Sequence, residues 1–513
     1  MTLYSLRSPR LASLGRDFPA SIVVFMVALP LCMGIAVASG APPETALMTG
    51  IVGGILVGLI GGAPLQVSGP AAGLAVVVFE IGREQGIAAL GPILMAAGAL
   101  QFAAGLLGLG AWFRAISPAV IHGMLAGIGV LIVVVQLHVL IDGAPLPSAI
   151  ESLLAIPGAF IDVVLLNTSN GPPALAVGML TIATMLAWER FRPARLKMLP
   201  GALMGVSAGA ALANVAALPI RYVEVPAAIF SGLTELPGLA NVGLLASSEA
   251  WVPVFVIAVI ASAETMLSAA AVDRMHDGPR ARYDRELSAQ GLGNVVCGLI
   301  GALPMTGVIV RSSANVQAGA VTRWSAVLHG VWILAFVALL PQALALVPTA
   351  ALAGILVVVG WRLVSLVHVR DLFRRYGAMP AAVWAATLVL VVTVDLLTGV
   401  LVGLALALVE IVPHLRKRYL LIRSCPTGER NISLKLAGSA TFLQLPRLEK
   451  ELAAVSPDAN VRIETRRLAY IDHTTSEMIA EWADRRPACV EMAEPVAAHE
   501  RRLAAALMRH AAA

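Results

Sequence analysis

Long runs of apolar residues, separated by short polar or Pro/Gly-rich connections, fill the chain up to about residue 418. There are about fourteen such runs, and most have the length and composition of helices that cross a lipid bilayer. Two of them, at 70–80 and 311–321, are too short to do so as continuous helices. The pattern predicts an all-α polytopic membrane protein. The runs are centred near residues 18–39, 44–61, 70–80, 91–109, 117–140, 173–189, 198–217, 251–272, 287–302, 311–321, 324–340, 348–366, 380–394 and 396–413.

Each short run follows a segment that no uninterrupted membrane helix would contain. Pro64 and Pro70 lack backbone donors and Gly69 loosens the backbone before the first run, and Pro304 stands before the second. The two runs occupy corresponding places, the third span of each half. We therefore expect two inverted repeats of seven spans, about 18–217 and 251–413, in which an extended segment leads into a half-helix at spans 3 and 10.

Composition and charge support this topology. Hydrophobic residues make up 58% of the chain, charged residues only 13%, and the mean hydropathy is +0.84, so most of the chain cannot form a soluble surface. With the N-terminus inside, nearly all Lys and Arg of the connections fall on the cytoplasmic side, and only Arg83 and Arg221 fall outside. We predict a cytoplasmic N-terminus (1–17), a transmembrane domain (18–418) and a multi-pass protein of the plasma (inner) membrane with both termini cytoplasmic. The net charge of +5 reflects this topology and does not indicate nucleic-acid binding.

The start of a half-helix attracts an anion, because its first amides lack partners and lie at the positive end of the helix dipole. In the first half these amides belong to Ala71, Ala72 and Gly73. Arg311, followed by Ser312, stands at the opening of the second half-helix, too far from either membrane surface to reach the headgroups easily. We predict that these residues bind the substrate. For Arg311 the alternative is an interfacial anchor.

A carboxylate lies deep in the first span of the second half. Glu264 is flanked by apolar and small residues, and Ser268 follows one helical turn later on the same face. We predict a site for a coupling ion, H⁺ or Na⁺. The alternative is a structural ion pair with Arg311, and both roles are compatible. A protonated or cation-bound Glu264 would leave the positive charge of Arg311 for an anion, so that cation and anion binding would support each other.

After Arg418 the sequence becomes charged and soluble in character. Asn431–Leu436 and Val461–Thr465 alternate like strands, whereas Leu445–Val455 and Thr475–Ala483 are amphipathic. The order reads βαβα, and we place a small cytoplasmic α/β domain at 428–513. The chain shows no nucleophile motif, phosphate loop or metal-ligand cluster, and its four cysteines have neither metal-ligand nor disulfide spacing, so an enzyme is disfavoured.

Four blocks of the chain resemble the signatures of the SulP, or sulfate permease, anion transporters. They are residues 27–40 (VALPLCMGIAVASG), 64–70 (PLQVSGP), 284–294 (DRELSAQGLGN) and 311–319 (RSSANVQAG). The resemblance implies a core domain, spans one to four and eight to eleven, that moves against a gate domain in an elevator-like mechanism. Glu264 and Ser268 match the positions that hold the coupling cation in sodium-dependent bicarbonate members. Pro30 and its neighbour Cys32 match the first-span wall of the pocket.

The sequence departs from these relatives in places. Sodium-bicarbonate members tend to have Thr where this chain has Ala71, which removes one side-chain ligand for Na⁺. Arg311 matches the basic residue of many sulfate-type members and exchangers, while the first-span block resembles bicarbonate-type members. Residues 468–477 (LAYIDHTTSE) resemble the strand-to-helix corner of STAS domains, but His473 follows Asp472 where regulatory relatives have a phosphorylatable Ser. The resemblance implies a role for this short domain in trafficking, stability or dimer contacts.

The residues and the resemblance together predict secondary active transport of a small inorganic oxyanion, sulfate or bicarbonate, coupled to H⁺ or Na⁺. The alternatives are a dicarboxylate or nucleobase symporter of the same fold and a passive anion channel or exchanger. We expect no cofactor and no metal beyond a possible Na⁺ as coupling ion. The expected partners are the anion, the lipid bilayer and a second copy of the chain in a homodimer.

Overall fold

The chain forms two compact units, 1–110 with 125–364 and 111–124 with 365–513. The computed structural model describes residues 11–110, 117–143, 149–165, 171–193, 196, 199–224, 236–273, 275–276, 278–364, 370, 373, 378–394, 396–415, 420–426, 431–441, 444, 447–448, 451–452, 454–456, 459–471, 475, 478–479, 482–483 and 490–492.

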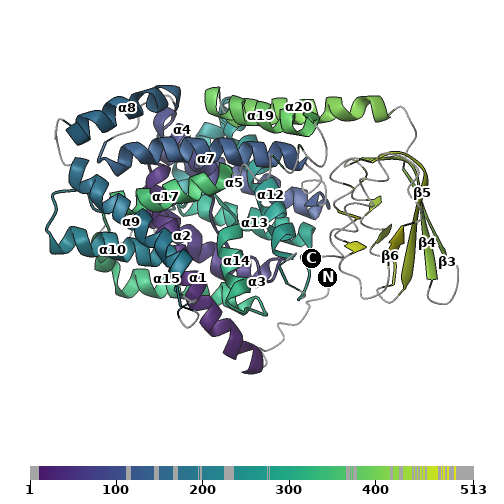
Figure 1. The fold of residues 1–513 in the computed structure, drawn as a ribbon, viewed down its shortest axis with the longest axis horizontal. Helices are drawn as coiled ribbons and strands as arrows, with labels where there is room; N and C mark the ends of the chain where they lie inside the picture. Colours follow the sequence, from purple (N-terminus) through teal and green to yellow (C-terminus); the bar gives the residue numbers. More distant parts are fainter. Residues whose placement is uncertain are drawn as a thin grey trace. The chain divides into compact units, whose positions relative to one another are not determined.

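Most of the described residues before residue 416 are helical, and each predicted apolar run coincides with a helix (Figure 1). Six of the described helices are long and apolar enough to cross a membrane, and shorter apolar helices accompany them. The first helix starts at Leu11, inside the predicted tail 1–17, because Leu11–Asp17 continue its helical pattern. The helices are α1 (Leu11–Ala38), α2 (Pro43–Val52), α3 (Gly58–Ile60), α4 (Ala75–Glu84), α5 (Leu90–Leu106), α7 (Pro118–Leu140), α8 (Ala149–Leu165), α9 (Gly171–Phe191), α10 (Gly201–Val215), α11 (Pro237–Ala240), α12 (Trp251–Asp273), α13 (Tyr283–Leu299), α14 (Ile309–Gln317), α15 (Trp324–Leu339), α16 (Pro341–Ala345), α17 (Thr349–Val364), α19 (Ala378–Thr393) and α20 (Leu396–Leu415).

The two broken spans have the predicted construction. Each consists of a short extended segment, β1 (Ser68–Pro70) or β2 (Met305–Gly307), and a half-helix, α4 or α14. The sequence did not show that the two extended segments pair with each other: β1 and β2 form an antiparallel ladder in which Gly69 lies opposite Thr306. The ladder satisfies backbone groups that would otherwise be unpaired at membrane depth, and it brings the starts of α4 and α14 together.

A π-helical turn, Gly53–Val57, interrupts the second span between α2 and α3. Glycines at its start allow the backbones of three elements to approach closely. A Cβ atom at Gly53 would lie 2.7 Å from the Ser68 carbonyl oxygen of β1, and one at Gly54 would lie 2.6 Å from the Cα of Gly330 in α15. The turn therefore seats the second span against both the β1 segment and α15.

The soluble part contains a four-stranded sheet of order β3-β4-β5-β6, made of β3 (Leu421–Pro426), β4 (Asn431–Ala440), β5 (Asn460–Ile471) and β6 (Val490–Met492). The β4–β5 and β5–β6 pairs are parallel, which requires crossovers, and most of the described residues of the two predicted amphipathic segments are helical. Leu448, Leu452 and Ile479 of these segments pack on the sheet.

The predicted boundary of this soluble domain at 428 is too late. Strand β3 begins at Leu421 and pairs antiparallel with β4, so it belongs to the same sheet. Asp472 and His473, at the predicted strand-to-helix corner, lie outside the described residues.

Candidate functional site

Arg311 is fully buried in the first turn of the half-helix α14. Its Nη2 atom donates a hydrogen bond to the sulfur of Cys32, at 3.3 Å, whereas Nε and Nη1 have no hydrogen-bond partner. The position is electrostatically unfavourable, because a helix N-terminus repels a cation and burial removes hydration. A buried, underpaired guanidinium of this kind is stabilised by an anion that binds beside it.

The backbone of β1 lies directly against this guanidinium. A Cβ atom at Gly69 would overlap with Nη1 of Arg311. The glycine therefore makes room for the arginine, and the unpartnered Nη1 atom lies beside the segment that leads into α4. Arg311 therefore contacts the first broken span.

Glu264 lies on α12 at the start of the other half-helix. Its Oε2 atom would be 3.0 Å from a Cβ atom at Gly73, and it has no hydrogen-bond partner. The Thr306 hydroxyl of the β2 segment lies beside the carboxylate. One turn further along α12, the Ser268 hydroxyl is also buried and unpartnered. These two oxygen-bearing groups therefore have free acceptor positions for a proton or a cation.

Glu264 and Arg311 do not form an ion pair. The guanidinium binds Cys32 through Nη2 and is otherwise unpartnered, and Oε2 of Glu264 is unpartnered as well. The structural ion pair that the sequence left open as an alternative is therefore wrong for this state. The two opposite charges instead lie at the starts of different half-helices, where each remains available to a ligand.

Two of the predicted substrate contacts need correction. The amide of Ala71 donates to the carbonyl oxygen of Pro304, at 3.1 Å, so the backbone donors left at the start of the first half-helix are those of Ala72 and Gly73. The hydroxyl of Ser312 donates to Val308 and accepts the amide of Val67, so it joins α14 to the β1 segment. Both residues form hydrogen bonds with backbone groups far along the chain, the amide of Ala71 with Pro304 and the hydroxyl of Ser312 with Val67. The pattern of a single sequence does not reveal such bonds.

Pro30 and Cys32, the predicted wall residues, lie on α1, and both are buried. Pro30 stands inside the helix, where its missing N–H removes one backbone hydrogen bond. Cys32 faces Arg311, as the hydrogen bond between them shows. On this side, the predicted wall presents the thiol of Cys32, which contacts the guanidinium of Arg311.

Sequence reasoning missed several polar residues around the site. Asn294 of α13 clamps Met305 of β2 through both its amide nitrogen and its carbonyl oxygen, and Gln290 donates to the Ser68 hydroxyl of β1. Both belong to block 284–294, but the role of each depends on which strand α13 contacts. These two side chains hold the β1–β2 ladder in place.

His329 of α15 is another missed residue. It is fully buried, its Nδ1 lies 2.8 Å from the Ala326 carbonyl oxygen, and its Nε2 is unpartnered. It lies beside Gly54 of the π-helical turn and within electrostatic reach of Arg311. The sequence signal that could have identified His329 is the presence of a histidine inside the apolar run 324–340.

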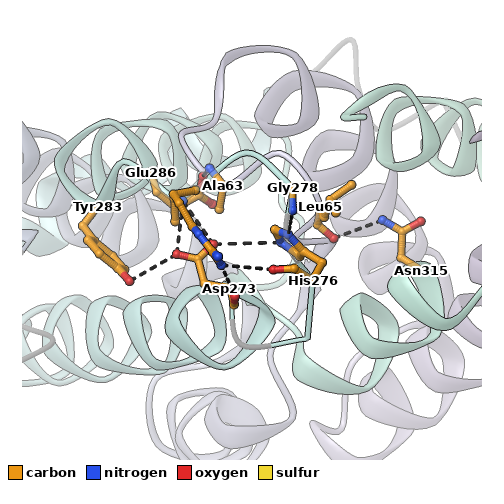
Figure 2. Close-up of polar contacts among 10 residues, drawn as sticks. Ala63, Leu65, Asp273, His276, Gly278, Tyr283, Glu286 and Asn315 are labelled. Carbon is orange, nitrogen blue, oxygen red and sulfur yellow. Dashed lines mark hydrogen bonds and ion pairs between the residues drawn. The ribbon is translucent and has the colours of Figure 1, made fainter. Parts of the chain in front are cut away.

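The first turn of α13 anchors the segment that leads into β1 (Figure 2). The Glu286 carboxylate accepts hydrogen bonds from the amides of Gly62 and Ala63, at 2.7 and 2.9 Å. At the end of α12, Asp273 accepts the Ala281 amide and the Tyr283 hydroxyl. Helix α12, α13 and the segment before the first broken span are thus tied together at this end.

Comparison with known proteins gives the family. Residues 14–387 match the model of the sulfate permease family. The chain belongs to the sulfate permease family. It is therefore an anion transporter in a membrane, and the predicted absence of enzymatic function agrees with the transporters among its relatives. The resemblance of the four sequence blocks is confirmed.

Similar members of the family carry different names. The putative sulfate transporter YvdB of Bacillus subtilis is 32% identical over 400 residues, which cover 77% of this chain and 73% of that protein. The bicarbonate transporter BicA of a Picosynechococcus species is 27% identical over 406 residues, 76% and 69% of the two chains. The solved transmembrane domain of a cyanobacterial BicA matches with a TM-score of 0.63 at 24% identity, covering 78% of this chain and 98% of that one. This last likeness shows the shared fold.

Proposed function

We propose that this protein is a secondary active transporter of a small inorganic oxyanion, sulfate or bicarbonate. The observation that carries the proposal is the buried guanidinium of Arg311, which has unpartnered Nε and Nη1 atoms and lies in the first turn of α14. An oxyanion accepts charge-assisted hydrogen bonds from such a group and is favoured by the helix dipole. The names of YvdB and BicA support sulfate and bicarbonate equally.

The backbone supplies the second set of donors. Ala72 and Gly73 at the start of the first half-helix, together with the first turn of α14, offer amides to the same anion. The β1–β2 ladder holds these two helix starts at a fixed separation. The proposed site is thus built from backbone on both sides and from one cationic side chain.

We assign the coupling ion, H⁺ or Na⁺, to Glu264 and Ser268. A bare carboxylate at the start of α4 competes with the substrate anion for the same positive helix end, because both carry negative charge. A proton or Na⁺ on Glu264 removes this competition and thereby couples the two binding events. Na⁺ would find Oε2 and the Ser268 hydroxyl, but at Ala71 it lacks the side-chain ligand that sodium-dependent members tend to have.

Alternating access in this proposal is elevator-like. The ladder and Ser312 join the two half-helices to each other, and Asn294 and Gln290 join the ladder to α13. These elements therefore move as one body and carry the anion with them. The gate domain, a homodimeric assembly and cytoplasmic termini belong to the same proposal. They are supported by the distribution of basic residues and by the family.

Uptake into proteoliposomes tests the proposal. The purified full-length protein is reconstituted, and labelled sulfate and labelled bicarbonate are offered separately under an imposed proton gradient, an imposed sodium gradient or no gradient. We expect one of the two anions to accumulate, and only with one of the gradients. The proposal fails if neither anion moves under any condition. Equilibration without accumulation would indicate a passive channel or exchanger. If a dicarboxylate or nucleobase accumulated instead, it would replace the oxyanion as the proposed substrate.

A further inference from the structure

The guanidinium of Arg311 makes its one hydrogen bond to a thiol. The sulfur of Cys32 on α1 accepts from Nη2 at 3.3 Å, and the side chain of Cys32 is fully buried. On its other side the sulfur is enclosed by α2, since a Cβ atom at Gly50 would lie 3.2 Å from it. The thiol therefore has a fixed place between α2 and the guanidinium.

No other acceptor within the described residues orients this guanidinium. Gly69 limits its position by contact but offers it no acceptor, and Nε and Nη1 are unpartnered. The direction in which these two nitrogen atoms point is thus determined by Nη2 and its sulfur partner. Without that partner the side chain can turn away from the half-helix starts.

The chemical nature of the acceptor matters as much as its position. Sulfur is a weak acceptor and the thiol is neutral, so Cys32 orients Arg311 without neutralising it. A carboxylate in the same place would form an ion pair with the guanidinium and oppose anion binding. A hydroxyl would preserve both the orientation and the charge, and an aliphatic side chain would preserve only the charge.

We propose that Cys32 is a positioning residue that sets the anion affinity of the site through Arg311. This inference rests on the proposed anion transport. It assigns to the thiol a role that packing alone would not require, namely to hold the cation in register with the two half-helix starts while leaving it underpaired.

Three substitutions of Cys32 separate the hydrogen bond from packing. Serine and alanine leave similar space behind, so a difference between them reports the acceptor. For Cys32→Ala we expect the apparent KM for the transported anion to rise about three- to tenfold, the effect of losing one hydrogen bond of ordinary strength to a weak sulfur acceptor. The maximal rate should change less than about twofold. Cys32→Ser should stay close to the wild type. Cys32→Asp should suppress uptake strongly.

Cys297 on α13 provides the matched control. It is equally buried, and its side chain makes no contact with Arg311 among the contacts of the described residues. Cys297→Ala and Cys297→Ser should therefore leave the apparent KM unchanged. In an Arg311→Gln background, Cys32→Ala should add nothing, because the two residues act through one contact.

The outcomes distinguish the possibilities. Equal KM values for wild type, Cys32→Ala and Cys32→Asp would overturn the positioning role while leaving the transport proposal intact. Equal losses in Cys32→Ala and Cys32→Ser would reduce Cys32 to a packing residue. Anion-dependent thermal stabilisation of the detergent-solubilised protein gives a second readout that needs binding but not transport. If the wild type neither transports nor is stabilised by sulfate or bicarbonate, the proposed function and this inference both fail.

Discussion

Nη1 of Arg311 occupies the place that a Cβ atom of residue 69 would take. Gly69 is needed for this close approach and not for an unusual backbone conformation. We predict that Gly69→Ala displaces the guanidinium and raises the apparent KM for the anion at least about tenfold, because the added methyl group cannot be accommodated beside a buried ladder. Labelled-anion uptake into proteoliposomes measures the effect.

Gly82→Ala is the control for this change. Gly82 lies on the adjoining half-helix α4, where an added Cβ atom would meet only the end of Ile87, at 3.7 Å. Uptake by this variant should match the wild type. Normal KM values for Gly69→Ala would show that Arg311 need not stay where the structure places it.

A second prediction concerns the charge of Arg311 itself. Arg311→Gln removes the cation but keeps a polar side chain, and we expect it to weaken anion binding by more than about tenfold, the value of a charge-assisted pair. Arg311→Lys keeps the charge without the planar fork, so its anion affinity should lie between those of the wild type and Arg311→Gln. An unchanged anion affinity in Arg311→Gln would remove this residue from the binding site.

The third prediction concerns coupling. Glu264→Gln keeps the shape of the side chain but cannot take up a proton, and it is a poor ligand for Na⁺. We expect gradient-driven accumulation to disappear, whereas exchange of labelled for unlabelled anion persists, because the competing carboxylate is permanently neutralised. Unchanged accumulation would make Glu264 a structural residue.

Ser268→Ala then distinguishes the two coupling ions. With Na⁺ as the coupling ion, loss of the buried hydroxyl removes a ligand and raises the Na⁺ concentration needed for half-maximal uptake. With H⁺ the hydroxyl has no such role, and the dependence of uptake on the proton gradient should stay as in the wild type. Uptake measured over a series of Na⁺ concentrations at fixed pH makes the comparison.

A fourth prediction tests the corrected role of Ser312. Ser312→Ala leaves the buried amide of Val67 without its partner, which costs about 1–3 kcal/mol. We expect a lower melting temperature of the detergent-solubilised protein. Ser313→Ala removes only a hydroxyl that bonds to Val310 within its own helix, and it should change the melting temperature little. Equal melting temperatures in the two variants would argue against the clamp between α14 and β1.

The broken spans were predictable because proline and glycine act locally. Pro64, Pro70 and Pro304 cannot support a continuous helix, so an extended segment followed by a half-helix could be expected from each stretch alone. The prediction of Glu264 and Ser268 as a coupling-ion site has a similar local basis, since a carboxylate in an apolar run needs a partner or a ligand. The positions of the helices could likewise be predicted from the positions and lengths of the apolar runs.

The remaining features depend on partners far along the chain. Gln290 and Ser68 are 222 residues apart, and Ser312 and Val67 are 245 apart. Which amide is free at a half-helix start, and which hydroxyl is occupied, follows from such pairs and not from the local pattern. The hydrogen bonds of Ala71 to Pro304 and of Ser312 to Val67 are of this long-range kind.

The β1–β2 ladder also has a consequence for how the protein is made. Ser68–Pro70 enters the membrane with the first half of the chain, but its hydrogen-bond partners, Met305–Gly307, are synthesised much later. Until then the backbone of the first broken span must be sheltered by water, by the insertion machinery or by other helices, because lipid offers it no partner. The proposed anion site therefore forms only when the second half of the chain has been inserted, and neither half on its own would contain it.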